Sequence, residues 1–222
     1  MDEYLSDKEQ AERLKKWWLE NYRSILAGIV IALLIIGGWR YWQHRVQTRS
    51  AAASAMFNSM SDALTAGNGP EALKLGNSLI SQYSDTPYAA QAALAMARFD
   101  VETGKPDDSM KMLDWVIQHS KDPNLVLLAK LRMARVKLAV GDAQAALKVL
   151  DVKDAGGFAA LFSDVRGDAY VKLGNVEQAR KAYSEALANW SDEMGDKSLI
   201  QMKLNALAAP ADSKPAAGAK TK

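Results

Sequence analysis

The sequence predicts an all-α protein, with one membrane-spanning helix near the N-terminus followed by a solenoid of about four helix pairs and a short capping helix. Two observations predict this fold. The first is an uncharged apolar run at 24–39, SILAGIVIALLIIGGW, which is long enough with its flanks to cross a bilayer. The second is an alanine-rich remainder with helical periodicity, interrupted by glycine at intervals of 33 to 37 residues, which is the spacing of stacked helix-pair repeats.

The apolar run is the first element. Arg23 and Arg40 bracket it, and residues 22–42 span roughly 31 Å at the 1.5 Å helical rise, which matches the hydrocarbon core of a bilayer. Aromatic residues stand at both ends: Trp17, Trp18, Tyr22, Trp39, Tyr41 and Trp42. A buried helix of a soluble protein rarely has both aromatic belts, and a signal peptide rarely has so long a segment before its apolar run. We therefore expect an uncleaved anchor at 22–42, in contact with membrane lipid, after an N-terminal segment at 1–21.

Basic residues flank the anchor unequally. Five Lys or Arg residues precede the uncharged run at 24–39 and three follow it before Lys74, which favours a cytoplasmic N-terminus and a large domain on the other side of the membrane. Within the anchor, Ser24, Gly28 and Ala32 are spaced four apart and share one helix face. Small side chains at this spacing let another membrane helix approach closely, although they also occur by chance. We treat the three residues as a candidate transmembrane helix contact.

The clearest repeat unit is SDVRGDAYVKLGNVEQARKAYSEALANW at 163–190. Gly167 and Ala179 are small where two helices would cross closely, Gly174 ends the first helix, and Tyr183 fills the space between layers. This pattern resembles the tetratricopeptide repeat, although the leading Trp and Leu and the closing Pro of that repeat are missing. The resemblance implies a right-handed α-solenoid.

Earlier units follow the same pattern less closely. Steps of 33 to 37 residues back along the chain reach the equivalent turn glycines: Gly141, Gly104 and Gly67. The first unit fits worst, because Met60 and Gly76 stand where a small and a large residue are expected. A generic helical bundle is the alternative, but bundles lack this period. We expect the repeat domain at 43–207 with a closing helix at 199–207, then an Ala/Pro/Lys-rich disordered tail at 208–222.

The first helices of the pairs would line the concave face of such a solenoid. Aliphatic residues at two helical positions, with cations near them, form a candidate peptide-binding face: Phe57, Leu64, Leu94, Arg98, Val101, Leu131, Arg135, Leu138, Val171 and Lys172. An apolar groove with a few cations suits an extended polypeptide. The alternative is that the aliphatic residues are ordinary core, because alanine-rich helices need larger side chains to fill the interior.

The composition and motifs predict no catalysis. Cysteine is absent, and the histidines His44 and His119 lie far apart, so we expect no metal site. Residues 50–208 hold 17 basic and 19 acidic residues, with no basic block that would bind nucleic acid. No Gly-rich phosphate loop, HExxH or GxSxG motif occurs. We therefore expect a protein-interaction domain without a cofactor, and not an enzyme.

Several segments together resemble the YfgM family, the ancillary subunit of the SecYEG translocon. They are GGWRYW at 37–42, LRMARVKL at 131–138, DAQAALKVLD at 142–151, DVRGDAY at 164–170 and QMKLNAL at 201–207. The resemblance implies a single-pass protein of the bacterial inner membrane with its repeats in the periplasm. The partners that it implies are the translocon, the periplasmic chaperone PpiD and newly exported polypeptides.

Two other functions remain open from the residues. The repeats could serve as a scaffold for another cell-envelope assembly, such as cell-wall synthesis or division. With the opposite topology, the protein would be a cytoplasm-facing regulatory adaptor.

Overall fold

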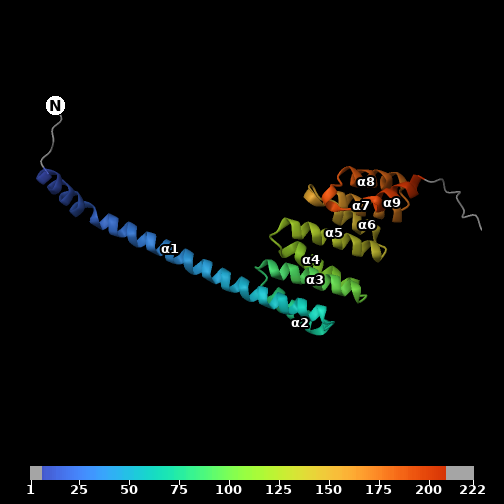
Figure 1. The fold of residues 1–222 in the computed structure, drawn as a ribbon, viewed down its shortest axis with the longest axis horizontal. Helices are drawn as coiled ribbons and strands as arrows, with labels where there is room; N and C mark the ends of the chain where they lie inside the picture. The colour runs from blue at the N-terminus through green and yellow to red at the C-terminus, as the bar shows by residue number, and fades with distance from the viewer. Residues whose placement is uncertain (1–6, 209–222) are drawn as a thin grey trace, which may run out of the picture. The chain divides into compact units, whose positions relative to one another are not determined.

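The computed structural model describes residues 7–208, and over this range all regular secondary structure is helical (Figure 1). The expected disordered tail falls almost entirely on residues 209–222, outside the described residues, as do residues 1–6 of the N-terminal segment. The chain divides into two compact units between Ala52 and Ala53. The all-helical prediction is confirmed.

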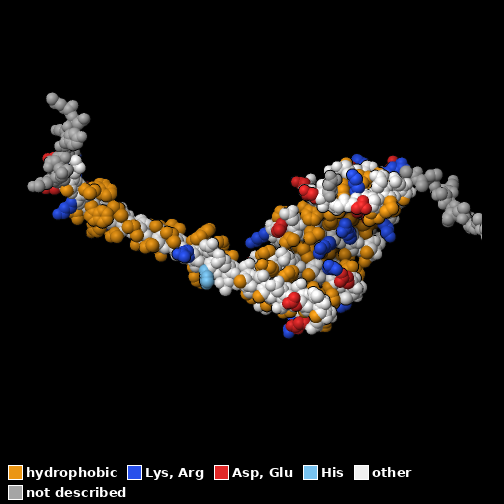
Figure 2. Space-filling view, viewed as in Figure 1, with side chains coloured by type: hydrophobic (Ala, Val, Ile, Leu, Met, Phe, Trp, Pro, Cys, Tyr) orange, Lys and Arg blue, Asp and Glu red, His pale blue; other side chains and the backbone are white. Residues whose placement is uncertain are grey.

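Helix α1 (Asp7–Thr65) contains the apolar run, and by length and composition it is the one helix of the described chain that could cross a membrane. Its most apolar stretch has no buried side chain in this structure, with Leu34 exposed to 71% and Ile35 to 66%. Hydrophobic side chains cover much of this part of the helix (Figure 2). Water is a poor solvent for such a surface, so an uncovered apolar stretch of this length favours the anchor over the buried helix of a soluble protein. The helix continues past the anchor expected at 22–42 and ends at Thr65, within the range expected for the repeat domain.

The second unit is a row of helix pairs, as predicted. The last part of α1 is followed by α2 (Gly69–Gln82), α3 (Pro87–Glu102), α4 (Pro106–His119), α5 (Pro123–Ala139), α6 (Ala143–Leu150), α7 (Ala159–Lys172), α8 (Val176–Ala188) and α9 (Ser198–Ala208). Short 3-10 turns lie at η1 (Gly156–Phe158) and η2 (Asp192–Met194). From α2 onward each helix packs on the next, and α9 packs on α8 as the expected closing helix (Figure 1).

The recurring glycines are helix ends. Gly67, Gly104, Gly141 and Gly174 all have φ between 73° and 90°, a conformation that glycine adopts without steric cost. In each case the next residue donates its backbone N–H to the carbonyl five residues earlier, at 2.7 to 2.9 Å. This is the hydrogen bond of a Schellman C-cap. The interval of 33 to 37 residues in the sequence is therefore the interval between identical turns inside successive helix pairs.

The packing of the first helix pair explains why its sequence departs from the repeat pattern. In the last pair, a methyl group on Gly167 would overlap the ring of Tyr183, so the small residue lies on the first helix and the large one on the second. In the first pair the sizes are exchanged. Met60 on α1 is fully buried, and a Cβ on Gly76 of α2 would overlap Met96 Sδ and lie 3.2 Å from Met60 Cε. The same space is filled from the opposite helix.

Candidate functional site

The structure sorts the predicted concave residues into core and surface. Leu94 and Leu131 are 5% and 1% exposed and pack in the clusters between helix pairs. For these two side chains the core interpretation holds and the groove interpretation is corrected, because alanine-rich helices leave the space that they fill. Phe57 and Leu64 are half-buried and pack in the hydrophobic cluster around Met60 in the first helix pair.

The remaining candidates line two adjoining hollows, which we call the Arg135 groove. The first hollow has a volume of about 290 Å³ and is lined from α3, α4 and α5 by Ala97, Arg98, Val101, Glu102, Ser109, Leu113, Arg132, Arg135 and Val136. The second has a volume of about 470 Å³ and is lined from α5, α7 and α8 by Arg135, Leu138, Ala139, Asp168, Val171, Lys172 and Tyr183. Arg135 belongs to both. Leu138, although 9% exposed, contributes to the second hollow.

Positive charge exceeds negative charge in the first hollow, where three arginines face one glutamate. The exposed Arg98 is hydrogen-bonded through Nε to Glu102 Oε1 at 2.7 Å, and this bond raises the pKa of Arg98. Arg132 is half-buried and donates from Nη1 to the Leu94 carbonyl at 3.3 Å. Burial, followed by the charges of Arg98 and Arg135, lowers the pKa of Arg132. The hollow therefore presents uncompensated guanidinium charge beside apolar walls, which can hold an acidic group next to an aliphatic one.

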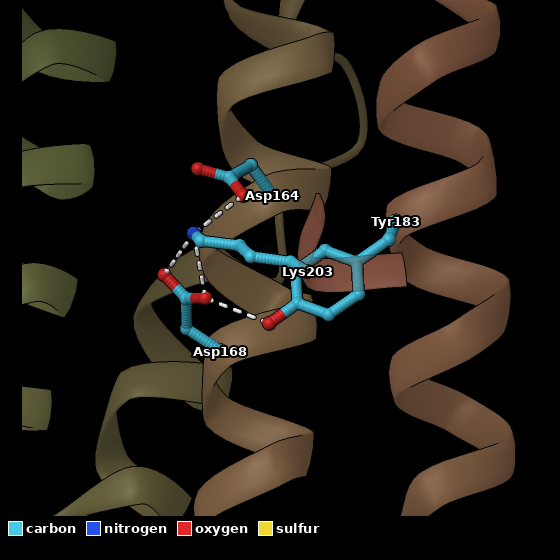
Figure 3. A network of polar contacts seen from close by, with 4 residues as sticks. All are labelled: Asp164, Asp168, Tyr183 and Lys203. Atoms are coloured by element: carbon cyan, nitrogen blue, oxygen red, sulfur yellow. Dashed lines mark hydrogen bonds and ion pairs between the residues drawn. The ribbon is translucent and has the colours of Figure 1, made fainter. Parts of the chain in front are cut away.

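A polar network fastens α9 to the last helix pair (Figure 3). Lys203 Nζ lies 2.8 Å from Asp164 Oδ1 and 2.7 Å from Asp168 Oδ1. The Tyr183 hydroxyl donates to Asp168 Oδ1 at 2.7 Å, and Lys203 Nζ lies 5.5 Å from the Tyr183 ring centroid. Burial opposes the charge of Lys203, but its bonds to the two carboxylates outweigh burial and raise its pKa. Burial and the bond to Asp168 raise the pKa of Tyr183 strongly.

Sequence reasoning missed this network. Asp164 and Asp168 are four residues apart on one helix, so they share a face, and Lys203 lies in the expected closing helix. That pattern was a usable signal. It could not identify the partner, because 35 residues separate Asp168 from Lys203.

The candidate membrane contact lies in the open part of α1. Ser24, Gly28 and Ala32 are all exposed, and a Cβ on Gly28 would meet nothing within 4 Å. The residues are thus accessible to another helix, and their role stays a prediction. Among residues 7–208, no group of three or more His, Cys, Asp or Glu side chains is placed to hold a metal ion.

Comparison with known proteins extends over both units. Residues 15–209 match the tetratricopeptide repeat-like domain family. A protein of Escherichia coli named ancillary SecYEG translocon subunit is 30% identical over 208 residues, which cover 93% of this chain and 99% of that protein. A protein of the same name from Neisseria gonorrhoeae is 27% identical, with 93% and 100% covered.

Solved structures support the fold. MamA, from residue 41 to its end, from Desulfovibrio magneticus RS-1 superposes with a TM-score of 0.52 at 17% identity, over 70% of this chain and 93% of that one. A MamA double mutant gives the same TM-score at 18% identity. At these identities the likeness concerns the fold alone.

Proposed function

Because the chain belongs to the family of ancillary SecYEG translocon subunits and carries a tetratricopeptide repeat-like domain, we propose that it is a non-catalytic adaptor of the Sec translocon, anchored in the inner membrane by one helix. The observation that carries this proposal is the extent of the match. The aligned 208 residues take in the apolar helix as well as the repeats, and they cover nearly the whole of the relatives.

The proposed arrangement places residues 1–21 in the cytoplasm, the anchor at 22–42 in the lipid and the repeat domain at 43–207 in the periplasm. The excess of basic residues before the anchor supports this orientation. The Ser24–Gly28–Ala32 face would contact a translocon helix, since small side chains allow close approach.

The repeats would act on the periplasmic side as a binding surface for newly exported polypeptides and for the chaperone PpiD. The Arg135 groove supports this role, because it combines exposed aliphatic side chains such as Val101 and Val171 with cations such as Arg98 and Lys172. An extended chain offers both kinds of partner: apolar side chains, and carbonyl or carboxylate oxygens.

Topology is the first test. The chain has no cysteine, so a single Lys105→Cys substitution gives a clean reporter in the turn between α3 and α4. Lys105 is exposed and its side chain makes no capping hydrogen bond, whereas the equivalent Asn68 caps α2 and is better left intact. Glu12→Cys, at an exposed position before the anchor, is the matched control.

We expect a membrane-impermeant maleimide to label Lys105→Cys in intact spheroplasts and to label Glu12→Cys only after lysis. The reverse pattern would place the repeats in the cytoplasm and refute the adaptor at the exit side of the translocon. Partner identity is tested by a photo-crosslinking residue at Gly28, with Leu26 on another face of the helix as control. Crosslinks to cell-wall or division proteins in place of translocon subunits would favour a different envelope scaffold.

A further inference from the structure

We propose that the first hollow of the Arg135 groove is a carboxylate-binding subsite, which selects acidic side chains with an aliphatic neighbour in the polypeptides that the domain holds. The inference deepens the proposed function and rests on it, because it names the chemistry of the segment that the groove accepts.

The charge of the hollow is the first argument. Arg98, Arg132 and Arg135 line it with one acidic residue, Glu102, which is already bonded to Arg98. This leaves Arg132 and Arg135 with no carboxylate partner in the hollow. Guanidinium groups bind carboxylates through paired, charge-assisted hydrogen bonds, which are stronger than neutral ones.

The walls decide which anion fits. Val101, Leu113 and Val136 line the hollow; Val101, which is 49% exposed, offers most of their apolar surface. Apolar surface suits the aliphatic neighbour of an acidic residue better than a sugar or phosphate. The domain as a whole is slightly acidic, with 17 basic and 19 acidic residues over 50–208, so it would repel a long polyanion. An acidic, partly apolar polypeptide segment is the ligand that satisfies both conditions.

The test measures peptide binding to the full-length protein in detergent micelles by fluorescence anisotropy. The probe is a short labelled peptide of Gly-Glu-Leu repeats with blocked termini, so that side chains supply its only carboxylates. The matched peptide carries Gln in place of Glu. We expect the Glu peptide to bind about tenfold more tightly, which corresponds to ~1.4 kcal/mol.

Arg135→Gln should remove most of that preference, leaving about a twofold ratio, because it deletes the guanidinium that both hollows share. Lys137→Gln is the control: it removes the same charge from the same helix, α5, but lines a different hollow of about 530 Å³ with Asp107, Asp114 and Asp151. It should leave the ratio unchanged.

The outcomes separate the two proposals. Equal binding of both peptides would overturn the carboxylate subsite and leave the peptide-binding groove intact. Binding of neither peptide would remove the groove as a polypeptide site and the subsite with it. A preference that Lys137→Gln reduces as much as Arg135→Gln would show general electrostatic attraction, which also refutes the subsite. Loss of preference in Arg135→Gln alone, at unchanged helicity, would support it.

Discussion

The exchanged pair Met60 and Gly76 gives a sharp test of how the first repeat is packed. Met60→Ala removes a fully buried side chain and should cost about 3 kcal/mol of unfolding free energy through lost burial and the cavity left behind. Gly76→Ala gains up to ~1 kcal/mol of helix propensity. Its methyl group, however, would overlap Met96 Sδ and press on Met60 Cε, at about 2 kcal/mol. The net cost of Gly76→Ala is then about 1 kcal/mol.

The double variant should be more stable than the sum of the single ones. Once Met60 is shortened, Met96 can move into the vacated space, so the methyl group of Gly76→Ala no longer collides and its helix propensity is gained in full. The double variant should lose about 2 kcal/mol where additivity gives about 4, a coupling of about 2 kcal/mol.

The assay is urea unfolding of the full-length protein in detergent, followed by circular dichroism, with hydrogen exchange of α2 as a local readout. Gly167→Ala is the control, because its collision is with Tyr183, far along the row of repeats. Met60→Ala should not rescue it. Additive effects of Met60→Ala and Gly76→Ala would refute the exchange, since they would mean that the two positions do not share one space.

Two further predictions concern the network at α9. Lys203→Met leaves Asp164 and Asp168 without their cationic partner. It should lower the free energy of unfolding by about 1 to 2 kcal/mol, a discounted value for a partly exposed pair, and the melting temperature by about 2 to 8 °C. Lys197→Met, at an exposed position, is the control and should change both little. The pKa values of Lys203 and Tyr183 are raised above their ordinary values of 10.5 and 10.0, so this stabilisation is complete below pH 10 and is lost as pH rises through the folded-state values. Tyr183→Phe, compared by thermal melts from neutral to alkaline pH, should lose stability less steeply above pH 10 than the parent; an equal slope would contradict the role of the hydroxyl.

The turns were predictable from the sequence because they are local. Gly67, Gly104, Gly141 and Gly174 each end a helix through bonds to residues at most five positions away, so their spacing alone defined the repeats. The apolar helix was equally predictable from the sequence, because the absence of charge over 24–39 is a property of one continuous segment.

Other features depend on what lies across the fold, and a periodic pattern does not contain that information. Leu131 and Val101 both belong to the aliphatic rows, yet one is 1% exposed and the other 49%. Periodicity gives the face of a helix but not the neighbour that covers it. Met60 and Gly76 seemed poor matches because each was compared with the repeat pattern separately, whereas the two deviations compensate each other in space.

The C-cap glycines determine the turns of the solenoid, whereas other positions determine the surface of the groove. Backbone hydrogen bonds and a positive φ fix each turn, and neither depends on the side chains that line the Arg135 groove. Substitutions in the groove can therefore accumulate without disturbing how one helix pair follows the next. Two proteins that keep these glycines can therefore share one backbone while the charge and shape of their grooves differ.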